Sequence, residues 1–97
     1  MQLARVIGTL VATRKDEKME GLKFLIVRPI DTDGKDTPAT ALVAVDAVGA
    51  GAGEVVMIAT GSSARQTALT DRRPCDAVIM AIVDTWEVGG QVKYRKE

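Results

Sequence analysis

The sequence predicts a mainly β protein, a small OB-like five-stranded β-barrel with one short helix and a C-terminal hairpin. Segments rich in Val, Ile, Leu and Thr recur along the 97 residues, and Gly, Asp or Pro separates them. One stretch between two of these segments carries the residue types that begin a helix. A chain of this length is expected to form a single domain, residues 1–97, with a thin core of its own.

The strand segments follow in order along the chain. We expect strands at residues 2–13, 22–31, 39–48, 54–60, 77–87 and 91–96. The charged stretch 14–21 separates the first two, Asp33-Gly34 provides the next turn, and Gly89-Gly90 turns the final hairpin. In the second strand, alternation assigns one apolar face to Leu22, Phe24, Ile26 and Ile30, with Arg28 interrupting it.

A short helix is expected between the fourth and fifth strands. Ser63 and Gln66 have the S-x-x-Q spacing of a capping box, so the helix should begin there. Pro74 should end it. In this position the helix would plug or flank the barrel.

Three strands are apolar on both faces, at 41–45, from Val55 onward and at 77–83. A half-buried strand would instead alternate apolar and polar residues. A small barrel has one interior, and one short helix cannot cover the remaining faces. The sequence therefore indicates an oligomer, in which a neighbouring subunit covers them.

Composition excludes several classes of function. Cys75 is the only cysteine and the chain has no histidine, so we expect no disulfide, no metal site and no cofactor. Thirteen basic and thirteen acidic residues give zero formal charge, so no field attracts nucleic acid or a membrane. The N-terminal segment has neither a membrane span nor a secretion signal, which predicts a cytoplasmic protein.

The glycine-rich stretch 48–54 superficially resembles a phosphate-binding loop. Gly49, Gly51 and Gly53 give G-x-G-x-G, but Glu54 stands where the dinucleotide motif has its third glycine. A strand follows, although a phosphate loop needs a helix N-terminus. We therefore interpret the stretch as a bulged turn in which glycine permits positive φ and close contact.

Other polar residues allow functional and structural interpretations. Gly61-Ser62-Ser63 with Arg65 could bind an anion at the helix start, but simple N-capping is favoured. A serine nucleophile would need a base, and histidine is absent. Carboxylates at strand ends are interpreted as turn and interface residues: Asp46, Asp76 and Asp84.

The three aromatic residues are too few for a nucleic-acid groove. Phe24 lies on an apolar face and should be in the core, whereas Trp86 and Tyr94 should pair across the final hairpin. The alternative function, an OB-like ligand- or nucleic-acid-binding module, needs stacking aromatics and a basic groove. The composition disfavours it, and a nucleotide-using enzyme is weaker still.

Three segments carry a resemblance over nearly the whole chain. They are ARVIGTLVATRKDEKMEGLKFLIVRP at 4–29, LVAVDAVGAGAGEVVMIATGSSAR at 42–65 and CDAVIMAIVD at 75–84. Through them the chain resembles the EutN/CcmL family, the vertex proteins of bacterial microcompartment shells. The resemblance implies a pentamer without catalytic residues, located in the shell in the cytoplasm, with hexameric shell proteins as partners.

The resemblance also gives the loops a role, as a hypothesis. Five copies of a small loop could crowd near a symmetry axis, either Gly49, Ala50, Gly51, Ala52, Gly53 and Glu54 or the turn Gly61, Ser62, Ser63 and Arg65. The sequence does not decide between these two loops. The outer charged loop is a candidate contact with the hexamers through Arg14, Lys15, Asp16, Glu17 and Lys18.

Overall fold

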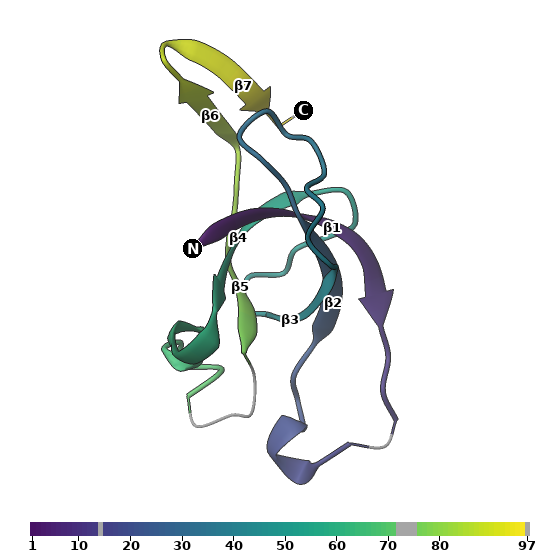
Figure 1. Ribbon diagram of the computed structural model, residues 1–97. Helices are drawn as coiled ribbons and strands as arrows, with labels where there is room; N and C mark the ends of the chain where they lie inside the picture. The colour runs from purple at the N-terminus through teal and green to yellow at the C-terminus, as the bar shows by residue number, and fades with distance from the viewer. Residues whose placement is uncertain (14, 72–75, 97) are drawn as a thin grey trace.

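Five strands close into a barrel in the computed structural model, which describes residues 1–13, 15–71 and 76–96. The strands are β1 (Gln2–Leu10), β2 (Phe24–Pro29), β3 (Leu42–Asp46), β4 (Val55–Thr60) and β5 (Ala77–Ile82). They follow one another around the barrel in the order β1-β2-β3-β5-β4, and β4 pairs with β1 to close it (Figure 1). β3 and β5 are parallel, and every other neighbouring pair is antiparallel.

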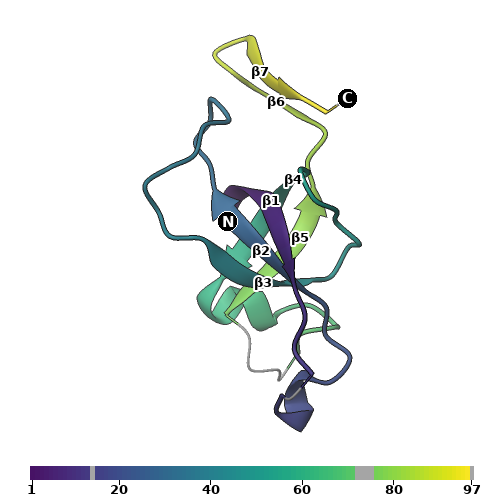
Figure 2. The same ribbon diagram turned by 90° about the vertical axis from the view of Figure 1, so that its right-hand side faces the viewer.

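The last two strands leave the barrel. β6 (Thr85–Val88) and β7 (Gln91–Arg95) form a separate two-stranded sheet, which we call the arm. Figures 1 and 2 show the arm projecting from one end of the barrel. Two short 3₁₀ helices, η1 (Glu17–Met19) and η2 (Gly61–Arg65), lie at the opposite end.

The fold class is confirmed, but three details of the prediction are wrong. The predicted strand 77–87 is interrupted at 83–84, and its second half belongs to the arm. The predicted capping box does not form: η2 begins at Gly61, and Ser63 Oγ donates to the Thr60 carbonyl (3.1 Å). The expected helix is thus a 3₁₀ helix, and Pro74, its predicted end, lies outside the described residues.

All five strands contribute to the barrel interior. Its buried side chains are Ala4, Val6, Leu25, Val27, Ala44, Ala50, Val56, Ile58, Ala77 and Ile79. On β2 the interior residues are therefore Leu25 and Val27, and the alternation assigned from sequence selected the opposite face. Phe24 is nevertheless buried, as predicted, in a second cluster outside the barrel interior.

That second cluster changes the argument for an oligomer. Its buried members are Leu22, Phe24, Val45, Ala59, Ala64 and Val78. Ala64 comes from η2, which contacts both β4 and β5, so the chain itself covers part of the outer apolar face. The expectation that one short helix cannot cover the outer apolar faces is therefore wrong where η2 packs on β4 and β5. Apolar side chains that stay exposed lie elsewhere, and on the barrel wall they include Ile7 and Val43.

Candidate functional site

The glycine-rich turn, residues 48–54, is fastened at both ends. Asp46 Oδ1 accepts hydrogen bonds from the amides of Val48 and Gly49, each 3.0 Å long. At the other end Gly53 N donates to the Val6 carbonyl, and Val6 N donates to the Glu54 carbonyl, both at 2.9 Å. These bonds hold the turn against β1 and confirm the turn role predicted for Asp46.

Glycine is needed at two of the three positions in this turn. Gly49 and Gly53 have φ of +80° and +83°, in the region that disfavours side chains, as the bulged-turn interpretation predicted. Gly51 does not have positive φ. If glycine is needed there, the reason would be lack of room for a side chain rather than backbone conformation. Ala50 is buried in the interior of its own barrel, which removes it from the surface that a neighbour could contact.

Glu54 links this turn to the end of the arm. Its Oε1 accepts from the Gly51 amide and its Oε2 from Lys96 Nζ, both at 2.6 Å. The bond from Lys96, with help from the Gly51 amide, lowers the pKa of Glu54. The same bond raises the pKa of Lys96. Sequence analysis did not find this link, because 42 residues separate its partners.

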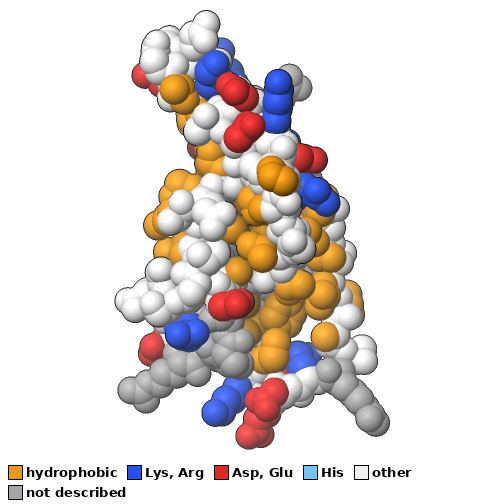
Figure 3. Space-filling model, viewed as in Figure 1, with side chains coloured by type: hydrophobic (Ala, Val, Ile, Leu, Met, Phe, Trp, Pro, Cys, Tyr) orange, Lys and Arg blue, Asp and Glu red, His pale blue; other side chains and the backbone are white. Residues whose placement is uncertain are grey.

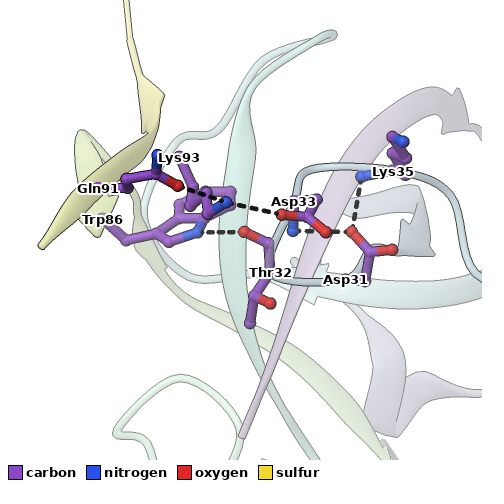
Figure 4. Close-up of polar contacts among 7 residues, drawn as sticks. All are labelled: Asp31, Thr32, Asp33, Lys35, Trp86, Gln91 and Lys93. Carbon is purple, nitrogen blue, oxygen red and sulfur yellow. Dashed lines mark hydrogen bonds and ion pairs between the residues drawn. The ribbon is translucent and has the colours of Figure 1, made fainter. Parts of the chain in front are cut away.

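The arm is also attached to the loop between β2 and β3. Trp86 Nε1 donates to the Thr32 carbonyl (2.7 Å), and Lys93 forms an ion pair with Asp33 (3.3 Å), as Figure 4 shows. Trp86 stacks on Tyr94 with ring centroids 4.7 Å apart, which confirms the predicted aromatic pair. The arm is therefore positioned by specific contacts on two sides.

The second candidate loop is exposed to solvent except at one residue. Gly61, Ser62, Ser63 and Arg65 of η2 are exposed, whereas Ala64 is buried beneath them. Thr70 Oγ1 is buried and donates to the Ala64 carbonyl (2.6 Å), which holds the helix against the segment that follows it. Thr70 was not singled out from sequence, since nothing local marks a threonine as buried.

The charged loop after β1 is ordered around Asp16. Its carboxylate accepts from the Lys18 amide (2.9 Å) and caps η1, which contains Glu17. Lys15 Nζ donates to the Ala12 carbonyl (3.2 Å). Arg14, the remaining member of the predicted contact loop, lies outside the described residues.

The barrel wall has an exposed apolar strip. In register across β1, β2 and β3 lie Gly8, Ile26 and Val43, and Ile7 adjoins Gly8. Ile7 and Val43 are 47% and 48% exposed. Figure 3 shows hydrophobic side chains gathered over the barrel, with charged ones toward the arm and toward the opposite end.

Features of other protein classes are absent from the described part of the chain. No three or more His, Cys, Asp or Glu side chains gather there to hold a metal ion. Neither of the described helices has the length or apolarity that a membrane span requires. Asp76 and Asp84, the other two carboxylates at strand ends, are exposed.

Fold and surface together define a small β-barrel protein whose exposed features are loops, an arm and an apolar wall. The family described as ethanolamine utilisation protein EutN/carboxysome matches residues 1–84. The chain belongs to this EutN/CcmL family.

Individual relatives match along the whole chain. The carboxysome shell vertex protein CcmL of Gloeobacter violaceus is 44% identical over 97 residues, which cover 100% of this chain and 96% of that protein. The solved structure of Gloeobacter violaceus CcmL superposes with a TM-score of 0.93 at 45% identity, covering 99% and 98% of the two chains.

A second relative carries an assembly state in its name. The GrpN pentameric microcompartment shell protein from Rhodospirillum rubrum superposes with a TM-score of 0.82 at 42% identity. The match covers 91% of this chain and 99% of that one.

Proposed function

We propose that this chain, acting as a single domain over residues 1–97, is a structural and non-enzymatic subunit of a five-membered ring. The ring caps the vertices of a bacterial microcompartment shell inside the cell. The observation that carries this proposal is the match over the full chain to proteins named as shell vertex proteins, in sequence and in fold. The pentameric relative supports the number of subunits.

The surfaces of the subunit are suited to ring closure. A cyclic ring needs a heterologous interface, in which one face of each subunit meets a different face of the next. The exposed apolar strip on β1–β3 provides a face that gains from being covered. A sequence without histidine also lacks the commonest catalytic acid or base, which supports a structural role.

Two loops are candidates for the centre of the ring. Gly49, Ala52 and Gly53 are exposed members of the glycine-rich turn, and Gly51 is half-buried beside them. The exposed residues of η2, Gly61 to Ser63 with Arg65, form the second candidate. Small residues in either loop would allow five copies to approach closely.

Hexameric shell proteins are the proposed partners at the rim of the ring. The ordered charged loop at Lys15, Asp16, Glu17 and Lys18 is the candidate contact, because charged side chains can bond carboxylates or carbonyls across the seam. An exposed ion pair contributes only about 0.2–1 kcal/mol. Affinity would therefore come from repetition of the contact around the ring.

Co-expression with hexameric shell proteins tests the proposal. Electron microscopy should show closed polyhedra when the chain is present and elongated, open or leaky assemblies when it is absent. Equally closed and impermeable shells in both preparations would contradict a vertex role. Assays of purified rings against nucleotides and nucleic acids should show no binding, which distinguishes this function from the alternative of a binding module.

A further inference from the structure

Two arginines face each other on the outside of the barrel wall. Arg5 on β1 and Arg28 on β2 are directly opposite in the antiparallel register. Both side chains are half-buried, and their neighbours Ala4, Val6 and Val27 point into the interior. Because strand residues alternate between faces, Arg5 and Arg28 lie on the outer face.

This arrangement costs the isolated subunit stability. Like charges directly opposite each other in a sheet repel. Arg5 Nη2 donates to the Gly34 carbonyl (3.3 Å), which satisfies one of its donors. The guanidinium of Arg28 carries five donors, but within residues 1–13, 15–71 and 76–96 it has no hydrogen-bond or ion-pair partner.

The arginines border the apolar strip. Ile26 lies two residues before Arg28 on the same face of β2, and its cross-strand partners are Gly8 and Val43. An apolar surface flanked by two arginines has the composition of a face that contacts another protein. When such a face is covered, a carboxylate of the partner can bind the guanidinium groups.

We propose that the β1–β3 wall receives the neighbouring copy of this chain in the ring, and that Arg28, with Arg5 beside it, binds a carboxylate of that copy. The inference rests on the proposed function and adds which face is used. The occupant is a second copy because a closed ring requires each subunit to offer a complementary face. The chain has as many acidic as basic residues, so a cationic face leaves unpaired acidic groups elsewhere on the same subunit.

Charge reversal at Arg28 makes opposite predictions for folding and for assembly. Arg28→Glu places a negative side chain directly opposite Arg5, so the repulsion between the two arginines becomes an attraction. The subunit should therefore fold at least as well as the wild type. The same change repels the carboxylate of the neighbour. We expect the subunit dissociation constant to rise by about tenfold or more, as seen when a bonded interface charge is lost.

The experiment follows ring mass by native mass spectrometry over a dilution series, with circular dichroism as the measure of folding. Arg95→Glu is the matched control, because Arg95 is an exposed arginine on the arm and its reversal changes net charge equally. We expect folded Arg28→Glu to dissociate at concentrations where the wild type and Arg95→Glu stay assembled.

A second variant identifies the carboxylate. Arg28→Lys introduces an amine that a zero-length carbodiimide can join to a carboxylate in contact with it. Rings assembled from mixed ¹⁴N and ¹⁵N subunits should give cross-links between a light and a heavy peptide at position 28. Wild-type rings treated in the same way should give none at this position.

The outcomes separate the inference from the proposed function. If Arg28→Glu rings are as stable as the wild type and position 28 gives no cross-link between subunits, the wall assignment is wrong while the ring stands. If the wild-type chain itself is a monomer, the proposed function fails and the inference fails with it.

Discussion

At the scale of single residues, Glu54 joins two parts of the molecule that are remote in sequence. One carboxylate oxygen binds the Gly51 amide and the other binds Lys96 beyond the end of β7. The arrangement holds while both groups are charged. The link between the glycine-rich turn and the end of the arm therefore depends on the ionisation of both residues.

The pH dependence of this link has a definite sign. The pKa of Glu54 is lowered from 4.5, so its contribution to stability is present above that pH and is lost as pH falls through the folded-state pKa. The pKa of Lys96 is raised from 10.5, so its contribution is present below that pH and is lost as pH rises through the folded-state pKa.

We predict that Glu54→Gln loses this dependence at acid pH. The amide oxygen can still accept from the Gly51 amide, but the ion pair with Lys96 is gone. Between pH of about 5 and about 3, the urea midpoint should fall more for the wild type than for the variant. Lys96→Met should show an intermediate fall, because the Gly51 amide still stabilises the ionised Glu54 carboxylate. An identical acid fall in all three proteins would contradict the role of the pair.

Substitutions at Gly53 and Gly51 distinguish the cost of an unfavourable backbone conformation from the cost of limited room for a side chain. Gly53→Ala places a side chain at φ of +83°, where nothing lies within 4 Å of the new Cβ, so its cost of about 1–2 kcal/mol is purely conformational. Gly51→Ala has no positive φ, and its Cβ would lie 3.3 Å from Glu54 Oε1, so a small shift of that carboxylate makes room and stability should change by less than about 0.5 kcal/mol. Urea unfolding at one fixed protein concentration measures both, and equal costs would contradict the distinction.

At the scale of elements, the arm has little contact with the barrel apart from a few side-chain bonds. We predict that Trp86→Ala unfolds the arm and weakens its attachment while the barrel persists, because it removes the Tyr94 stack inside the arm and the hydrogen bond to Thr32 outside it. Trp86→Phe is the control that keeps an aromatic stack and loses only the hydrogen bond, worth about 0.5–1.5 kcal/mol.

Hydrogen exchange tests the arm prediction directly. The amides of β7 should lose protection fully in Trp86→Ala and partly in Trp86→Phe. The amides of β4 should keep their protection in both variants. Loss of protection throughout the barrel would show that the arm is not an independent unit.

Sequence predicted the order of the barrel strands because their signals are local, but it predicted neither η1 nor the division of residues 77–87 into β5 and β6. Asp33-Gly34 and Gly89-Gly90 mark turns, and hydrophobic runs mark strands. The break between β5 and β6 has no glycine or proline. The break falls at Val83, whose amide donates to the carbonyl of Val55, the first residue of β4 (2.8 Å). Beyond this point β4 offers no further residue with which the chain could pair. The burial of Ala50 and the bond from Lys96 to Glu54 also depend on how the barrel closes. Neither could be predicted from the spacing of residues along the chain.

At the scale of the whole molecule, ring formation is the central expectation. Light scattering coupled to size exclusion should give one mass near five chains, and a stable monomer at micromolar concentration would contradict it. Crowding of the glycine-rich turn is a separate expectation, which a substitution in the turn tests. That turn would meet its symmetry copies if it lies at the axis.

We predict that Gly51→Trp damages assembly more than folding. Because Gly51 has an ordinary φ and its Cβ position meets only the end of the Glu54 side chain, the subunit should tolerate the substitution. Native mass spectrometry should show loss of the ring, while circular dichroism shows an intact barrel. A ring of wild-type mass and stability would assign the axis to another loop, and the equivalent substitution at Ser62 of η2 would be the next test.

The strand order β1-β2-β3-β5-β4 also has a kinetic consequence. β5 is inserted between β3 and β4, and Gln2 pairs with Ile58, so closure must wait for residues far apart in the chain to meet. Topologies dominated by such distant pairings fold slowly, over about milliseconds to seconds. During that time β3 and β4 have open edges that can pair with other chains. The rate of barrel closure thus sets how long a newly made subunit is exposed to aggregation before it can enter a ring.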